Sequence, residues 1–124
     1  MRTVQHILEA YDIQNPLEEM EVGDRYEVPA DDTAVNMDLT IEKVRDNEIS
    51  VAHYYTQRGD LMRDPEIVYR VTEEGDWTPI EYRQDPGIYQ QDRSGLPGVK
   101  DFAETWDRNL RKQGFLQAAQ GGSE

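Results

Sequence analysis

Cysteine is absent from all 124 residues of the sequence. Disulfides, thiolate zinc sites, iron–sulfur clusters and cysteine nucleophiles are therefore excluded together, and packing alone must stabilise the fold. Long apolar runs are also missing, because no stretch approaches the roughly 18 apolar residues that a membrane-spanning helix needs. The acidic N-terminal segment has no apolar core of the kind found in signal peptides. We therefore expect a soluble cytoplasmic protein with no membrane contact, built as one domain.

Positive charge is scarce as well. Thirteen basic residues stand against twenty-six acidic ones, which gives a formal net charge of −13. This balance argues against direct binding of nucleic acid through phosphate contacts. The charge is uneven, since residues 1–50 hold thirteen acids and four bases, whereas residues 51–124 hold thirteen acids and nine bases.

The most acidic stretch lies between Glu9 and Asp32, where nine carboxylates accompany Arg25 alone. Three explanations stay open: a solvated face that keeps the protein soluble, adaptation to high salt, or a surface for a basic partner. The candidate acidic surface consists of Glu18, Glu19, Glu21, Asp24, Glu27, Asp31 and Asp32.

Apolar residues recur at helical spacing near both ends of the chain. The first group predicts a short amphipathic helix that ends near Asn15–Pro16, since proline disfavours a helical residue before it. Gly114 is well placed just beyond the second helix, with Phe115 folding back onto its last turn. Residues 117–124 are expected to be a flexible tail. The two apolar stripes are Val4, Ile7, Leu8 and Tyr11, and then Val99, Phe102, Ala103, Trp106 and Leu110.

Between these helices, apolar and polar residues alternate as they do in half-buried strands. The predicted strands are "NMDLTIEKV", "EISVAHYY", "EIVYRV" and "WTPIEYR", with a further short strand at "RYEV". Residues 84–98 are rich in turn formers and predict a long surface loop. Short connections favour antiparallel neighbours. The predicted fold is α+β: a three- to five-stranded antiparallel meander, with the N-terminal and C-terminal helices packed on one face, in a single domain of residues 1–116.

The segment "HYYTQRGDLMRDPE", residues 53–66, allows two interpretations. His53 with Asp60 or Asp64 could act as a general base, because imidazole titrates near neutral pH and a carboxylate can orient it. However, alternation places His53 on the strand face that carries Val51, which favours a hydrogen-bonded core or interface histidine. The spacing of the acids matches neither zinc nor calcium sites, so no metal, no cofactor and no catalytic residue is predicted.

The same segment also reads as two strands joined by a tight hairpin. Two central residues at Arg58 and Gly59 would need positive φ in a type I′ turn, and Asp64-Pro65 would mark a kink or bulge. The candidate interaction surface near this end of the sheet consists of His53, Tyr54, Tyr55, Arg58, Asp60, Arg63 and Asp64.

Three strings occur in a characteristic order, "AHYY", "GDLMRDPE" and "QGF". In this respect residues 36–116 resemble a family of small uncharacterised domains from bacterial and archaeal genomes, phages, plasmids and integrative elements. Arg58 stands where members of that family typically have asparagine. The resemblance implies no activity and no functional residues. It implies a genomic setting among accessory and mobile-element genes.

Three functions follow as hypotheses. The first is a non-enzymatic accessory domain that contacts a protein partner of unknown identity. The second is an acidic nucleic-acid mimic that inhibits a DNA-binding or defence enzyme. The third is an enzyme that uses His53 with Asp60 or Asp64. Both a monomer and a homodimer are compatible with the sequence.

Overall fold

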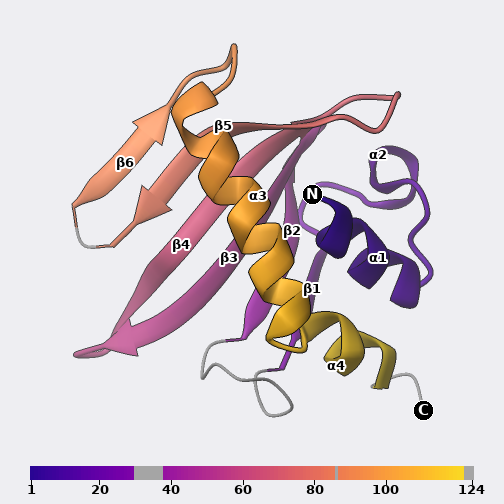
Figure 1. Cartoon of the computed structure of the whole chain (residues 1–124), viewed down its shortest axis with the longest axis horizontal. Coiled ribbons are helices and arrows are strands. Elements are labelled where there is room, and N and C mark those ends of the chain that lie inside the picture. The colour runs from indigo at the N-terminus through magenta and orange to yellow at the C-terminus, as the bar shows by residue number, and fades with distance from the viewer. Residues whose placement is uncertain (30–37, 86, 122–124) are drawn as a thin grey trace.

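The computed structural model describes residues 1–29, 38–85 and 87–121. Its centre is one antiparallel sheet in which each strand pairs with its neighbours in sequence, in the order β1-β2-β3-β4-β5-β6 (Figure 1). The strands are β1 (Arg25–Val28), β2 (Leu39–Arg45), β3 (Glu48–Gln57), β4 (Asp60–Val71), β5 (Trp77–Gln84) and β6 (Ile88–Gln91). The helices are α1 (Arg2–Ala10), α2 (Pro16–Glu19), α3 (Pro97–Lys112) and α4 (Phe115–Gly121). The α+β antiparallel class is confirmed, but the predicted upper limit of five strands is wrong.

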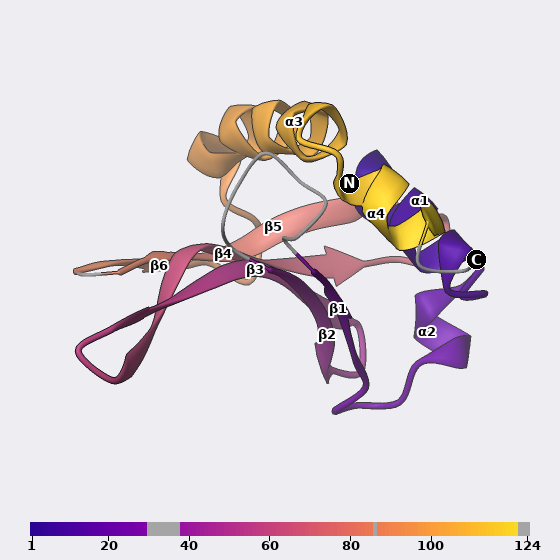
Figure 2. The same ribbon diagram turned by 90° about the horizontal axis from the view of Figure 1, so that it is seen from below.

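The helices gather on one side of the sheet. Figure 2 shows α1, α3 and α4 above it, while α2 lies beside its edge. The side chains buried between the layers include Val4, Ile7, Leu8, Ile41, Ile49, Val51, Ile67, Tyr69, Val99, Trp106, Leu110 and Phe115. In the described part of the chain, no helix is long and apolar enough to cross a membrane.

Strand β6 lies within the segment predicted as a long loop. Its four residues are all exposed, and it pairs with β5 through contacts such as Arg83 with Tyr89. A strand without a buried side shows no alternation of apolar and polar residues in its sequence. The turn-forming residues on both sides of β6 therefore predicted a loop there. The prediction of a loop over residues 84–98 is therefore corrected at β6.

The C-terminal tail also differs from the prediction, because α4 continues the fold as far as Gly121. Phe115 and Ala119, one helical turn apart, are both buried in the core. Gly114 adopts φ +98° after the end of α3, as the sequence predicts, and this turn returns Phe115 to the core. Residues 122–124 lie outside the described part.

Helix α2 is a further element that the sequence did not predict. Asn15 begins it, since its side-chain oxygen accepts a hydrogen bond from the Leu17 N–H at 3.1 Å, and Pro16 occupies the first helical position. The Asn15–Pro16 pair therefore starts a second helix. The predicted end of the first helix at this pair is wrong, because α1 ends at Ala10 and the backbone leaves the helical region at Asp12, where φ is +66°. From β2, the buried Lys43 Nζ donates to the carbonyl oxygens of Leu17 and Met20, at 3.0 and 2.7 Å.

The hairpin between β3 and β4 matches the sequence prediction. Gln57 pairs with Asp60, and φ is +53° at Arg58 and +86° at Gly59, as a type I′ turn requires. Further along, the register shifts between Ala52 and Tyr54, so that Asp64 and Pro65 together lie opposite His53. The predicted bulge at Asp64-Pro65 is confirmed.

Arg58→Asn is expected to raise the free energy of unfolding by about 0.5–1 kcal/mol. The left-handed backbone region at this position disfavours most L residues, whereas asparagine followed by glycine is the preferred type I′ pair. Urea unfolding measures the difference. Arg58→Ala, which keeps the unfavourable φ, is the control and should stay within about 0.5 kcal/mol of wild type. Equal stability of the Asn and Ala variants would contradict the turn argument.

Candidate functional site

The candidate interaction surface does not form one patch, and its histidine lies in the core. His53 is 3% exposed, with ring centroids of Trp106 and Phe115 at 5.6 and 5.1 Å. Its Nδ1 lies 3.3 Å from the carbonyl oxygen of Asp38. His53 lines none of the four prominent cavities of the described residues. These surroundings are those of a structural histidine.

The two acids proposed to act with His53 have different environments. Asp64 lies at the bulge opposite His53, and its Oδ1 accepts a hydrogen bond from Gln84 Nε2 at 3.0 Å. Asp60 is exposed at the hairpin, next to the exposed Arg58. The side chain of Tyr55 lies outside the described part. The buried imidazole gives no support to a general base.

Tyr54 and Arg63 do come together, on the side of the sheet away from the α1, α3 and α4 helices. They pair across β3 and β4, and the Arg63 guanidinium carbon lies 5.9 Å from the Tyr54 ring centroid. Arg63 Nε is 3.1 Å from Glu66 Oε1, while the Ser50 hydroxyl donates to Glu66 Oε2 at 2.6 Å. Burial, reinforced by Glu66, raises the pKa of Tyr54 despite the opposing effect of Arg63, so its hydroxyl stays protonated at neutral pH.

A second cluster of charged side chains lies on the same side, around Glu81. Arg45 and Arg93 both donate hydrogen bonds to Glu48. Arg45 also donates to Glu81 Oε2 at 3.0 Å. The Tyr89 hydroxyl donates to Glu81 Oε1 at 3.1 Å. Glutamates thus bridge arginines from distant parts of the chain, which orders the long side chains of both.

We call this side of the sheet the uncovered face. It carries six arginines and six acids, and Tyr54 and Tyr89 lie among them. The charged members are Arg25, Arg45, Arg63, Arg70, Arg83, Arg93, Glu27, Glu42, Glu48, Glu66, Glu81 and Asp85. Beneath them Ala52, Val68 and Ile80 are buried although they lie outside the cluster that the helices cover. The face is therefore electrically balanced in a chain of net charge −13.

The exposed edge of the sheet continues this face. Arg83 lies over the ring of Tyr89, with 4.6 Å between the guanidinium carbon and the ring centroid. Tyr89 of β6 is 49% exposed on this face, whereas its neighbour Ile88, 47% exposed, points to the other side of the sheet. Tyr54 and Arg63 belong to the interaction surface predicted from the sequence, whereas β6, and with it this end of the face, was not predicted.

The candidate acidic surface is exposed at Glu18, Glu19, Glu21, Asp24 and Glu27, whereas Asp31 and Asp32 lie outside the described residues. Several of these carboxylates have local partners. Glu19 Oε2 accepts from the Gln14 N–H at 2.8 Å, Asp24 Oδ2 accepts from the Glu21 N–H at 2.9 Å, and Glu27 lies 3.7 Å from Arg25 Nε. Part of the acidic charge therefore stabilises its own turns.

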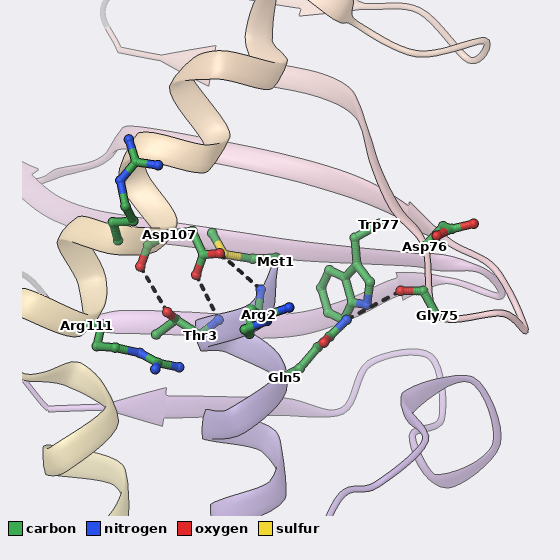
Figure 3. A pocket seen from close by; sticks show the side chains of 10 residues that line it. Met1, Arg2, Thr3, Gln5, Gly75, Asp76, Trp77, Asp107 and Arg111 are labelled. Carbon is green, nitrogen blue, oxygen red and sulfur yellow. Dashed lines mark hydrogen bonds between the residues drawn. The ribbon is translucent and has the colours of Figure 1, made fainter.

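A cavity of about 580 Å³ opens between the start of α1, the turn before β5 and α3 (Figure 3). Asp107 of α3 accepts hydrogen bonds from the backbone N–H groups of Arg2 and Thr3, at 3.1 and 2.7 Å. Burial by itself would raise the pKa of Asp107, but the hydrogen bonds from Thr3 and Arg2 outweigh it and lower that pKa below its ordinary value. The carboxylate thus satisfies the start of α1 and joins the two helices.

The cavity went unrecognised in the sequence because its walls come from segments far apart. Trp77 lines it from β5, while Gln5 of α1 reaches the Gly75 carbonyl oxygen at 3.5 Å across seventy positions. No local motif marks such a site. Among residues 1–29, 38–85 and 87–121, no group of three or more histidine and carboxylate side chains could hold a metal ion.

Comparison with known proteins gives one assignment. Neither a curated protein nor a solved structure matches the chain significantly. A family model described as a domain of unknown function, DUF6908, matches residues 2–116. That range reaches from the first turn of α1 into α4. The chain therefore belongs to the DUF6908 family.

Proposed function

We propose that this protein is a non-enzymatic accessory domain that binds another protein through the uncovered face of its sheet. The observation that carries the proposal is the ordered set of arginine and tyrosine side chains on that face, around Glu48, Glu66 and Glu81. Arginine and tyrosine are enriched in protein interfaces and among the residues that contribute most to binding.

The ion pairs support binding because they hold the arginines before a partner arrives. A side chain that is already ordered loses less conformational entropy on association. Glu48 and Glu81 bridge Arg45 and Arg93, and Glu66 holds Arg63 in the same way. The exposed ring of Tyr89 at the edge adds apolar surface that a partner can remove from water.

The charge balance of the face favours a partner without a strong net charge. Six arginines and six acids leave no excess on the uncovered face, so long-range attraction contributes little to binding. We therefore expect a complex that responds weakly to salt. The resemblance to domains of mobile elements makes an accessory-gene product a fitting partner.

Affinity purification of a partner from the native host, followed by binding measurements with purified proteins, tests the proposal. The double variant Arg83→Ala, Tyr89→Ala removes a half-buried arginine and an exposed aromatic ring from the uncovered face. Phe102→Ala, Arg108→Ala removes the same kinds of side chain from α3 on the opposite side. We expect the first variant to weaken binding at least tenfold and the second to bind like wild type. Equal binding by both variants would refute the proposal, and self-association alone would identify a second copy as the partner.

Nucleic-acid mimicry is the second candidate, favoured by the exposure of all five described carboxylates of the acidic surface. A mimic must bind the basic groove of a DNA-binding enzyme, and counter-charge attraction of this kind falls steeply with salt. The double variant Glu18→Gln, Glu21→Gln separates the two candidates, because both residues precede β1 and lie outside the strands of the uncovered face. Loss of the partner from this variant, together with dissociation between about 0.1 and 0.5 M salt, would support mimicry over contact through the uncovered face.

A further inference from the structure

Three adjoining cavities meet at Trp77, on the helix side of the sheet. Their volumes are about 580, 520 and 130 Å³, and Trp77 lines all of them. In Figure 3 the indole ring stands between α1 and the turn that carries Gly75 and Asp76. The outer cavity has the size of ordinary small-molecule sites. It lies opposite the uncovered face, so an occupant here is independent of the protein contact proposed above.

The smallest of the three cavities is lined by a tyrosine without a partner. Tyr69 is 2% exposed, and its hydroxyl has no hydrogen-bond partner among the described residues. Its ring packs edge to face on Trp77, with 5.6 Å between the centroids. Burial first, and the Asp107 carboxylate second, raise the pKa of Tyr69 far above its ordinary value. The hydroxyl therefore keeps its proton at neutral pH and can both donate and accept a hydrogen bond.

The outer cavity is lined by three arginines, Arg2, Arg108 and Arg111, and by two carboxylates, Asp76 and Asp107. Within the described part of the chain, no carboxylate forms an ion pair with any of them, and Arg111 donates instead to His6 Nδ1 at 2.6 Å. This is unexpected in a chain with twice as many acids as bases. The Asp107 carboxylate is engaged with the backbone at the start of α1, and the three arginines still exceed the two carboxylates. A positive excess of unpaired guanidinium groups around a concave site favours an anionic occupant.

We propose that the Trp77 cavities bind a small planar anion. Its ring lies against Trp77, its anionic group meets Arg2, Arg108 and Arg111, and a polar atom at its inner end forms a hydrogen bond with Tyr69. Guanidinium groups bind phosphate and carboxylate oxygens alike. The shared chemistry therefore fits either a nucleoside monophosphate or an aromatic carboxylate.

Tryptophan fluorescence reports on this site directly. The chain has two tryptophans, and Trp106 lies in the core, so a ligand in these cavities changes mainly the emission of Trp77. The probes are AMP and 4-hydroxybenzoate for the two sources, with adenosine and inorganic phosphate as the uncharged and non-planar controls. We expect a saturable change with AMP or 4-hydroxybenzoate, and at least tenfold weaker binding of both controls. No saturable response to either AMP or 4-hydroxybenzoate, or equal binding of inorganic phosphate, would overturn the proposal.

Two matched pairs of variants assign the contacts. Tyr69→Phe removes only the unpartnered hydroxyl and should weaken binding about tenfold, as expected for one lost hydrogen bond. Its unfolding midpoint should equal or exceed that of wild type, which separates lost binding from lost folding. The control is Tyr82→Phe, whose hydroxyl donates to Gln84 away from the cavities. Arg111→Gln should weaken binding similarly, whereas Arg83→Gln on the uncovered face should not. Unchanged affinity in Tyr69→Phe would exclude the assigned binding mode.

Discussion

Replacing Phe115 with alanine is expected to lower the free energy of unfolding by about 3–5 kcal/mol, as large-to-small substitutions of fully buried aromatic residues do. The Phe115 side chain is 0% exposed, and its ring packs beside the imidazole of His53. Removing it takes away apolar contact area and leaves a cavity where α4 meets the sheet. The substitution also removes the side chain that anchors the turn at Gly114 to the core. Urea or thermal unfolding measures the loss.

The chain supplies its own control, because it has only two phenylalanines. Phe102 on α3 is 41% exposed and packs at the surface against Tyr82. Phe102→Ala is therefore expected to cost about 1 kcal/mol, since much of the ring already contacts water. Similar losses of unfolding free energy in Phe115→Ala and Phe102→Ala would mean that Phe115 of α4 is not packed in the core as described.

Lys43→Ala is expected to destabilise the protein by about 2–4 kcal/mol. Lys43 is 5% exposed, and its ammonium donates to three carbonyl oxygens of α2 and its end, those of Pro16, Leu17 and Met20. The last carbonyls of a helix need partners of this kind, and a cation is favoured at the helix C-terminus. Alanine takes the ammonium donor away from these carbonyls, that of Met20 in a buried position, and opens a void between β2 and α2.

An exposed lysine separates this effect from a general change in charge. Lys112 lies in the last turn of α3 and is exposed, so Lys112→Ala removes the same charge from the surface and should stay within about 0.5 kcal/mol of wild type. Lys43→Met fills the void but donates no hydrogen bond, so its free energy of unfolding should lie between those of Lys43→Ala and Lys112→Ala. A Lys43→Ala variant as stable as Lys112→Ala would contradict the role of the ammonium group.

Elements with a clear apolar period were predictable from the sequence. The helix at Val99–Leu110, the hairpin at Arg58-Gly59 and the bulge at Pro65 all follow from local rules of periodicity and turn chemistry. Strand β6 and helix α4 do not follow from such local rules, and the reasons differ. The first has no buried side, and the second buries only a few residues of a short segment after a glycine turn.

The candidate site was less accessible to sequence reasoning. Strand alternation indicated a core position for His53, and it could have placed Tyr54 with Arg63 on the other side. What it could not supply is the pairing of Glu48 with Arg93, forty-five positions apart, or of Thr3 with Asp107. Such contacts depend on how the layers close and leave no pattern within any one segment.

The order of pairing in the sheet also bears on how the chain folds during synthesis. Each strand pairs with the one before it, so successive hairpins need only short loop closures. The helix layer is different, because α1 contacts α3 and α4, which come last. The apolar inner side of the sheet therefore stays open to water, and to other nascent chains, until α3 has left the ribosome. Chaperone demand should peak between completion of β5 and docking of α3, and the acidic first half of the chain reduces association with neighbours during that interval.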